Sequence, residues 1–426
     1  MHLTRRYFLK TSGLLALYCG ITPFDLLAQA GLSQKDIRPV AADRTLVVVF
    51  LRGGMDGLNF VVPHGDADYY KLRQSIAIAA PGSADGALDL DGHFGLHPRA
   101  AALRPLFQSG RAVALQAVGY DKNTRSHFEE QDTWETGVIG NTIASDGWLN
   151  RHLLTSAGRG PIRAVSVGDT LPRILRGEAP AYSMRGVDDL AFPKTAAPQD
   201  QALVGAALEH AYCCGPREAG QYAGAARDLL AETAQATFSG IEQLRGVVSA
   251  PYQPGAAYPE NEFGRKLREV ARLIKAGVGL EVAEIDYGGW DTHQNQGGAA
   301  GNYGNMVEGL AQGLAAFNQD LGSRMENVLV LTLSDFGRTA KENGTKGTDH
   351  GWANCMLAVG GPVKNRPRPV LGNWPGLGPE QLHERRDLLH TTDFRDVLGE
   401  VVRVHLGNPN IERILPGHAF QPVGLV

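Results

Sequence analysis

Asp335 and the pair Asp349-His350 are the residues of this sequence that most clearly suggest chemistry. Asp335 lies just past the apolar run 328–333, which is typical of a buried parallel strand. Asp349 and His350 follow in a loop rich in glycine and asparagine that can fold back over Asp335. Carboxylate and imidazole side chains brought together in this way suit a hard or borderline metal ion. A capping aspartate beside a loop salt bridge fits the same segment equally well.

Two further carboxylates follow predicted strands in the same manner. Asp56 lies in a glycine-rich turn after the apolar run 45–51, and Asp291 follows the run 280–287. Ligand sites in open α/β sheets lie beyond the carboxyl ends of the strands. His293 stands two residues after Asp291, so on an extended segment both side chains point to the same side. Turn chemistry alone is the alternative for Asp56, and structural pairing is the alternative for Asp291 and His293.

A hydroxyl group marks the start of another predicted element. The apolar run 112–118 predicts a strand, and Ser126 with Glu129 has the spacing of a capping box, so a helix is expected to begin near Ser126. A helix N-terminus attracts anions, and a hydroxyl there can attack phosphorus or sulfur if a metal or a base activates it. A simple helix cap is the other interpretation, and the local pattern favours it.

The remaining apolar patterns predict the framework that must position these residues. Strands are expected near 163–167 and 355–360. Helices are expected at 100–109, 261–276 and 303–321, and a C-terminal helix, capped by Thr391 or Thr392, is expected to end near His405. The pattern predicts one large α/β domain over residues 31–426, with a doubly wound, mostly parallel sheet and helices on both faces. Residues from about 169 to 259, including an alanine-rich helical stretch at 224–243, are interpreted as a cap or insertion.

The N-terminus has the three parts of an export signal in order. Arg5-Arg6 begins a twin-arginine motif, a modest apolar stretch follows, and Ala28-Gln29-Ala30 forms an A-x-A cleavage site. The apolar stretch is too short and too polar for a stable membrane span. Residues 1–30 are therefore predicted to be a signal peptide that the twin-arginine translocase reads, and the folded protein is expected to be periplasmic or secreted.

Charge and cysteine content exclude some classes of protein. The chain has a net charge of −4, and residues 1–30 contain three cationic side chains and one acidic side chain, or +2, so residues 31–426 carry −6. This charge argues against a nucleic-acid partner. Removal of the signal also removes one of the four cysteines, and the odd number that remains excludes a complete disulfide framework; the four are Cys19, Cys213, Cys214 and Cys355.

Seven short motifs together resemble the DUF1501 family, a group of exported bacterial proteins. The motifs are Arg-Gly-Gly-Met-Asp-Gly-Leu-Asn (52–59), Gly-Leu-His-Pro (95–98), Arg-Ser-His-Phe (125–128), Gly-Gly-Trp-Asp-Thr-His (288–293), Ser-Asp-Phe-Gly-Arg-Thr (334–339), Thr-Asp-His-Gly (348–351) and Thr-Thr-Asp-Phe-Arg (391–395). The family in turn resembles the alkaline phosphatase/sulfatase superfamily. That resemblance implies a large doubly wound α/β sheet and metal-dependent hydrolysis of phosphate or sulfate esters.

The same resemblance implies a set of metal ligands. Asp56 matches the first metal-binding aspartate of the superfamily, and Asp335 matches the aspartate of its Asp-His dipeptide, although Phe336 stands where the histidine would be. Asp291 and His293 resemble its Asp…His pair, with fewer intervening residues. His350, next to Asp349, resembles the last metal-binding histidine. The implied cofactor is a divalent ion such as Zn²⁺, Mn²⁺, Mg²⁺ or Ca²⁺, held either as two ions or as one shared ion.

The implied catalytic residues come from the motif at 125–128. His127 aligns well with a superfamily histidine that follows the nucleophile, which would place the nucleophile nearer Asn123 or Thr124 than Ser126. Ser126, with Thr124 as the alternative, is expected to attack the ester or to position it, and Arg125 is expected to offset its negative charge. The predicted substrate is a small or polymer-linked anionic ester. A non-catalytic binding or assembly protein with a degenerate site on this fold is the main alternative, and a metal-binding protein without turnover is a third.

Overall fold

The computed structural model describes residues 38–39, 44–140, 144–158, 162–190, 247, 251–363 and 368–426. The predicted signal peptide (residues 1–30), most of the predicted cap and the stretch 224–243 lie outside these residues.

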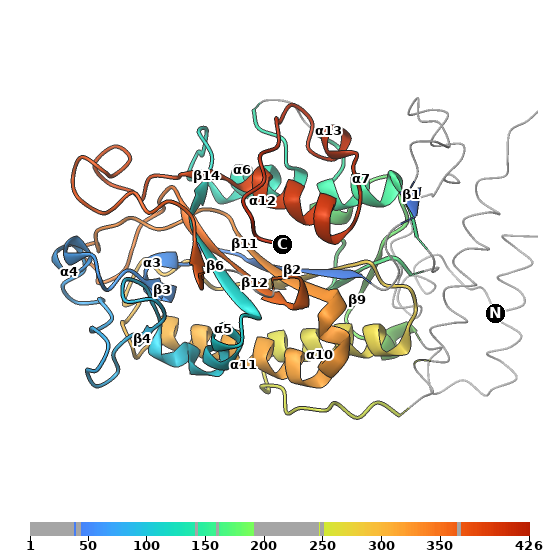
Figure 1. Cartoon of the computed structure of the whole chain (residues 1–426), viewed down its shortest axis with the longest axis horizontal. Helices are drawn as coiled ribbons and strands as arrows, with labels where there is room; N and C mark the ends of the chain where they lie inside the picture. The colour runs from blue at the N-terminus through green and yellow to red at the C-terminus, as the bar shows by residue number, and fades with distance from the viewer. Residues whose placement is uncertain are drawn as a thin grey trace, which may run out of the picture.

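A mostly parallel sheet forms the centre of the described structure (Figure 1). Its strand order is β13-β6-β12-β11-β2-β10-β8-β9, with β14 also paired to β6. All neighbouring pairs are parallel except the two that β12 makes with β11 and β6. The strands of this sheet are β2 (Thr45–Leu51), β6 (Ala112–Gly119), β8 (Ala164–Val167), β9 (Tyr182–Met184), β10 (Val282–Tyr287), β11 (Val328–Ser334), β12 (Asn354–Gly360), β13 (Val370–Leu371) and β14 (Thr392–Asp393).

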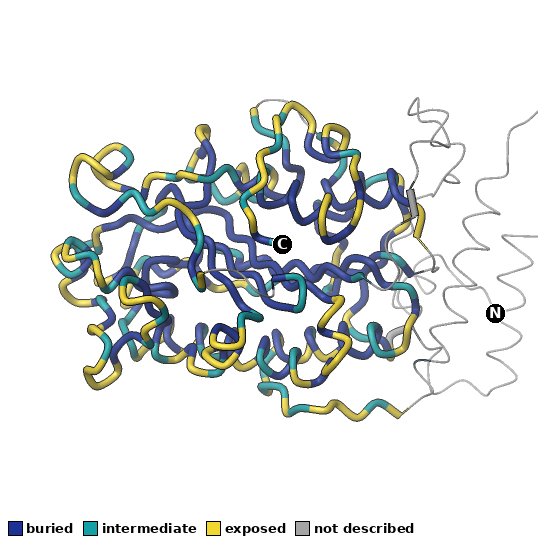
Figure 2. Tube along the Cα trace, viewed as in Figure 1, coloured by how far each residue is buried: buried dark blue, intermediate teal, exposed yellow. Residues whose placement is uncertain are grey.

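The side chains of the central strands alternate between two apolar cores. Val47 and Val49 of β2 pack into one core, whereas Leu46 and Val48 pack into the other, because successive side chains of a strand point to opposite faces. One core lies under α5, α10 and α11, and the other lies under α6, α7, α12 and α13 (Figures 1 and 2). The predicted doubly wound α/β fold class is therefore confirmed.

Helices and short strands complete the described part. The helices are α3 (Gly57–Phe60), α4 (Ala67–Leu72), α5 (Arg104–Gln108), α6 (His127–Thr136), α7 (Trp148–Leu154), α10 (Glu262–Ala276), α11 (Asn302–Leu321), α12 (Phe394–Glu400) and α13 (Ile411–Ile414). The 3-10 turns are Pro98–Leu103, Arg173–Leu175, Val187–Leu190, Gly322–Asn327 and Gly361–Val363, and a π-helical turn is Val401–His405. The short strands are β1 (Arg38–Pro39), β3 (Val61–Val62), β4 (Leu88–Asp89), β5 (Gly95–Leu96) and β7 (Ser156–Ala157).

Two predicted helix boundaries differ from the structure. The helix expected at 100–109 is a 3-10 turn followed by α5, with Pro105 in the first turn of α5. Proline cannot donate a backbone hydrogen bond and crowds the preceding turn, so a continuous helix cannot pass through it. The C-terminal helix is capped by Asp393, whose side chain accepts from the Arg395 N–H, and not by Thr391 or Thr392. The predicted cap contributes β9, which pairs with β8 at the edge of the sheet.

His97 and His405 are packed neutral in the interior. His97 accepts a hydrogen bond from the Arg99 N–H, and His405 donates from Nε2 to the Thr45 carbonyl at 3.0 Å. Burial is the main cause that lowers the pKa of each to about 4.

We expect these histidines to make the fold less stable in acid. A histidine in the unfolded chain has a pKa near 6.5 and is protonated below that pH. In the folded chain these histidines remain neutral until about pH 4. The free energy of unfolding should fall by on the order of 3 kcal/mol per histidine across that window. Urea unfolding between pH 7.5 and 4.5 measures this loss. A His405→Gln variant should lose distinctly less stability than the wild type over the same range, and equal losses would contradict the assignment.

Candidate metal centre

The candidate site lies at one edge of the sheet, where several segments meet. The carboxyl ends of β2, β6, β10 and β11 share this edge because these strands are parallel to one another. Antiparallel β12 begins at the same edge. His127 is the first residue of α6, Asp291 follows β10, and His350 precedes β12. Segments that are far apart in sequence therefore bring these three side chains together.

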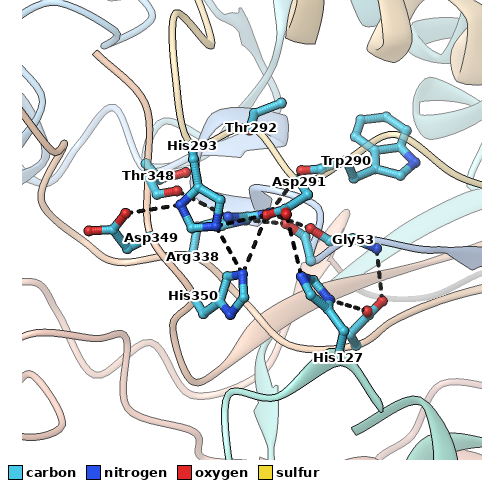
Figure 3. Close-up of polar contacts among 12 residues, drawn as sticks. Gly53, His127, Trp290, Asp291, Thr292, His293, Arg338, Thr348, Asp349 and His350 are labelled. Atoms are coloured by element: carbon cyan, nitrogen blue, oxygen red, sulfur yellow. Dashed lines mark hydrogen bonds and ion pairs between the residues drawn. The ribbon is translucent and has the colours of Figure 1, made fainter. Parts of the chain in front are cut away.

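His127, Asp291 and His350 form a compact group of possible ligands (Figure 3). One ligand atom from each lies within 4.8 Å of the others. Asp291 Oδ2 is 3.7 Å from His127 Nε2, and Asp291 Oδ1 is 3.4 Å from His350 Nε2. In a tetrahedral site with metal–nitrogen bonds of about 2.0–2.1 Å, neighbouring ligand atoms lie roughly 3.3 Å apart, so these separations are close to those of a metal centre.

His293 adds a fourth nitrogen beside this group. Its Nε2 lies 3.0 Å from Asp291 Oδ1 and 3.0 Å from His350 Nε2. Two unprotonated ring nitrogens facing each other at this distance repel, so a proton or a cation is needed between or beside them. Asp291 and His293, the predicted D-x-H pair, thus both point into one cluster together with His350.

Each of the three histidines is held through its other ring nitrogen. Nδ1 of His127 lies 2.6 Å from Asp335 Oδ2, and Nδ1 of His293 lies 3.0 Å from Asp349 Oδ1. Nδ1 of His350 donates to the Arg125 carbonyl at 2.8 Å. A carbonyl or an ionised carboxylate can only accept, so each of these Nδ1 atoms carries the proton. Metal-binding histidines are typically oriented in this manner by carboxylates and carbonyls.

The Nε2 atom of His127 faces the cluster without a hydrogen bond to any described residue. This atom is also buried. Buried polar atoms in proteins are nearly always satisfied, so such an exception calls for a specific explanation. A cation bound by His127, Asp291 and His350 would supply the partner, and the oxygen and nitrogen donors fit Zn²⁺ or Mn²⁺.

Asp335 lies behind His127 and does not face the cluster directly. It is fully buried and accepts hydrogen bonds from His127 Nδ1, from Gln131 Nε2 at 2.9 Å and from the Gly53 N–H at 3.1 Å. Burial alone would raise the pKa of Asp335, but these donors lower it below its usual value. The hydrogen bond to Asp335 in turn raises the pKa of His127. Asp335 is therefore placed to orient His127.

We expect Asp335→Asn to weaken metal binding without removing a direct ligand. An amide in place of the carboxylate loses the charged acceptor that fixes the His127 ring, and changes of this kind typically cost about 10–100-fold in metal affinity. Competition titration with a zinc indicator measures the change. Asp393→Asn, which alters an aspartate at a helix cap on the same fold, should leave zinc affinity unchanged. Zinc affinity equal in Asp335→Asn and the wild type would contradict the orienting role.

Arg338 is a buried cation that the sequence pattern did not single out. Its side chain is 0% exposed and donates to Asp291 Oδ1 at 2.5 Å. It also donates to the backbone carbonyls of Gly53, Gly54, Trp290 and Thr348. Burial would raise the pKa of Asp291, but the bond to Arg338 lowers it, so the carboxylate stays ionised. One side chain thus ties together the loops after β2 and β10 and the loop before β12.

Gly53 permits the close approach of two of these loops. Its φ is +113°, and a Cβ there would lie 2.7 Å from the Asp291 backbone nitrogen. Both the backbone angle and the lack of space therefore require glycine at this position.

Asp56 is placed in a different environment. Its carboxylate forms a fully buried ion pair with Arg73 at 2.5 Å and accepts from Gln296 Nε2 at 2.6 Å. Its second oxygen has no hydrogen-bond partner in the described part of the chain. The structure does not bring Asp56 into the group formed by His127, Asp291 and His350.

The predicted catalytic segment directly precedes His127 on α6. Ser126 is at the N-cap position, as expected, but its side chain makes no capping hydrogen bond within the described structure. Thr124 instead donates from its hydroxyl to the buried Glu130 at 2.9 Å. Arg125 has a left-handed φ of 59° and binds Asp387 and Glu384. The guanidinium of Arg125 is thus held by two carboxylates, while its carbonyl orients His350.

The expected loop salt bridge of Asp349 is present as a contact with His293. Asp349 is half exposed and also accepts from Asn343 Nδ2 at 3.0 Å. The hydrogen bond from Asn343 is the main cause that lowers the pKa of Asp349. Asp349 therefore orients His293, as Asp335 orients His127.

The comparisons with known proteins identify the family. The family model described as a protein of unknown function, DUF1501, matches residues 43–405. The chain belongs to the DUF1501 family. No curated protein matches this DUF1501 chain. A crystal structure of a sulfatase from Pseudoalteromonas sp. is similar at 12% identity with a TM-score of 0.23, covering 79% of this chain and 64% of the sulfatase. The chain thus spans less than two thirds of that sulfatase's length.

No helix in the described part is long and apolar enough to cross a membrane.

Proposed function

We propose that this DUF1501 protein is an exported, metal-dependent hydrolase of phosphate or sulfate esters. The observation that carries the proposal is the convergence of three Nε2 atoms on Asp291, each from a histidine whose Nδ1 is fixed by an acceptor. The buried Nε2 of His127 has no hydrogen-bond partner in the described structure, although a carboxylate oxygen of Asp291 lies 3.7 Å away.

The proposed ligands are His127, Asp291 and His350, with His293 as the fourth. Asp335 and Asp349 would orient histidines, and Asp56 would remain in its buried pair with Arg73. A divalent ion held there would supply Lewis-acid stabilisation of the negative charge that develops on an ester oxygen. Catalytic zinc sites typically use three protein ligands and keep the fourth position open for water or substrate, so His127, Asp291 and His350 would suffice, and a bound His293 would leave only a fifth position open.

The chain's own groups would bind and orient the ester. Ser126 is half-buried beside His127 at the N-terminus of α6, whose free N–H groups favour an anion. We propose that the Ser126 hydroxyl attacks or positions the ester, with Thr124 as the alternative. Thr124 is the weaker candidate because its hydroxyl is already bonded to Glu130. The guanidinium of Arg125 would contribute little positive charge at the ester, since two carboxylates already hold it.

A non-catalytic binding or assembly protein is the second candidate, and Arg338 is the observation that favours it. The Arg338 guanidinium already neutralises Asp291 at 2.5 Å. A cation built into the fold could replace a metal in a degenerate site.

Metal content and turnover separate the candidates. The mature protein, purified from the export host, is analysed for bound metals and assayed with 4-nitrophenyl phosphate, bis(4-nitrophenyl) phosphate and 4-nitrophenyl sulfate. The hydrolase proposal expects near-stoichiometric zinc or manganese and turnover that a chelator abolishes. Bound metal without turnover of any of these esters would indicate a metal-binding protein that is not a hydrolase. Absence of metal, even after incubation with Zn²⁺, Mn²⁺, Mg²⁺ and Ca²⁺, would support the binding protein.

Export through the twin-arginine pathway is the other part of the proposal. Arg5→Lys/Arg6→Lys should abolish accumulation of the mature protein in the periplasm, because the paired arginines are the feature that the translocase reads. Cell fractionation and immunoblotting measure the outcome. A matched Lys10→Arg variant should be exported normally. Export of the double-lysine variant at the wild-type level would contradict this route.

A further inference from the structure

A cavity lies directly beside the candidate metal centre. Its volume is about 280 Å³, and its lining includes Asp349 and Asn343. Asp349 also binds Nδ1 of His293, whose Nε2 belongs to the cluster around Asp291. One hydrogen bond and one imidazole ring therefore separate the cavity wall from the candidate metal position.

Three cationic side chains line this cavity: Lys341, Arg385 and Arg386. Lys341 is exposed and has no ion pair among the described residues. Arg385 pairs with Glu380, but both side chains are more than 70% exposed. Exposed ion pairs of this kind contribute little to the stability of the fold, so a ligand can replace them easily. Arg386 binds Asp387 and the His350 carbonyl while remaining 41% exposed. These side chains are thus available to a ligand.

The acidic groups of the cavity are already occupied by donors. Glu342 accepts from the Ser75 N–H, the Ser75 hydroxyl and the Ile76 N–H. Asp349 accepts from Asn343 and His293. With three cations against two carboxylates, the lining carries a net charge of +1. Lys341 is therefore the lining cation without a carboxylate partner in the described part of the chain, and Arg385 and Arg386 add partly exposed positive charge.

The loop that presents two of the cations is strained. Glu384 and Arg385 are successive non-glycine residues with left-handed φ values of 52° and 56°. Such conformations persist only where the surroundings enforce them, and they cluster at functional sites. Here the backbones of His383 and Asp387 bond to each other, and the His383 ring stacks on Trp352 with centroids 3.9 Å apart.

We propose that this cavity is an anion subsite, which binds a second negatively charged group of the substrate whose ester reacts at the metal centre. The inference rests on the proposed function and narrows its substrate class. The substrate is an ester that carries a further sulfonate, sulfate, carboxylate or phosphate in addition to the reacting group. A mono-anionic ester would leave the cavity empty.

The test compares two ligands that differ by one charged group. Phenylphosphonate and 3-sulfophenylphosphonate, which have no ester bond to hydrolyse, are titrated calorimetrically into the zinc-loaded mature protein. The same titrations are made with Lys341→Ala/Arg385→Ala and with the matched control Arg104→Ala/Arg265→Ala, which removes two exposed cations elsewhere. We expect the wild type and the control to bind the sulfonated ligand about tenfold more tightly than phenylphosphonate. The cavity variant should lose most of this preference and keep its affinity for phenylphosphonate and its zinc content.

The outcomes for the subsite and for the metal centre are separate. Equal affinities of the two ligands for the wild type, or a preference unchanged in the cavity variant, would overturn the subsite while the zinc content still supports the metal centre. If the protein binds no zinc, the proposed function fails. A preference for the sulfonated ligand that survives without zinc and is lost in the cavity variant would then support the subsite alone.

Discussion

His127→Ala/His350→Ala should lower the affinity of this protein for zinc by roughly 1,000-fold. The two substitutions remove two of the three side chains that converge within 4.8 Å. Loss of a partner that only orients a ligand costs about 10–100-fold, so loss of two direct ligands should cost more. Competition titration with a chromogenic zinc indicator measures both affinities, and circular dichroism confirms that the variant is folded.

A second pair of histidines provides the matched control. His64 and His418 each contact one aspartate, Asp89 and Asp396, at 2.9 and 2.7 Å, outside the cluster. His64→Ala/His418→Ala should therefore retain wild-type zinc affinity. If both double variants bound zinc equally well, the cluster of His127, Asp291 and His350 would not be the metal site.

Arg73→Leu should lower the free energy of unfolding by about 3–5 kcal/mol. Arg73 and Asp56 are both 0% exposed and form an ion pair at 2.5 Å. Removing one partner of a buried pair leaves an uncompensated charge in the interior, which is strongly destabilising. Arg73 also donates to the carbonyls of Thr339 and Ala340, so the loss includes hydrogen bonds within the fold. Urea unfolding followed by circular dichroism measures the change.

Two further variants show whether the buried pair is the cause. Asp56→Leu/Arg73→Leu should be less destabilised than Arg73→Leu, because both charges are then absent. Arg104→Leu, at an exposed arginine, should change the free energy of unfolding by less than about 0.5 kcal/mol. A loss below about 1 kcal/mol in Arg73→Leu would show that Asp56 does not depend on Arg73, and would return Asp56 to the set of possible metal ligands.

The framework of the fold was accessible from the sequence because its central strands are completely buried. The runs at 45–51 and 328–333 consist of residues that face one core or the other, so their apolar pattern is continuous. The structure places strands there, at Thr45–Leu51 and Val328–Ser334. The break in the helix expected at 100–109 was harder to predict from the sequence, because the effect of Pro105 depends on its position within the helical turn.

The candidate site was accessible only in part. The rule that ligand sites lie beyond the strand ends predicted that five side chains would approach one another, namely Asp56, Asp291, His293, Asp335 and His350. It could not say which carboxylate faces the cluster and which lies behind a histidine. That distinction depends on pairings such as Asp335 with His127, which are 208 positions apart. Asp56 and Arg73 illustrate the same limit, because an aspartate in a glycine turn looks identical in sequence whether it meets a metal or an arginine.

The measurement that tests the metal centre most directly is anomalous X-ray diffraction above and below the zinc absorption edge, on crystals of the mature protein grown with zinc. A metal ion bound at this site should give one strong anomalous peak within about 2.0–2.2 Å of His127 Nε2, His350 Nε2 and a carboxylate oxygen of Asp291. Absence of a peak at this position, with Arg338 still bound to Asp291, would contradict the proposed metal centre and the hydrolase function that depends on it.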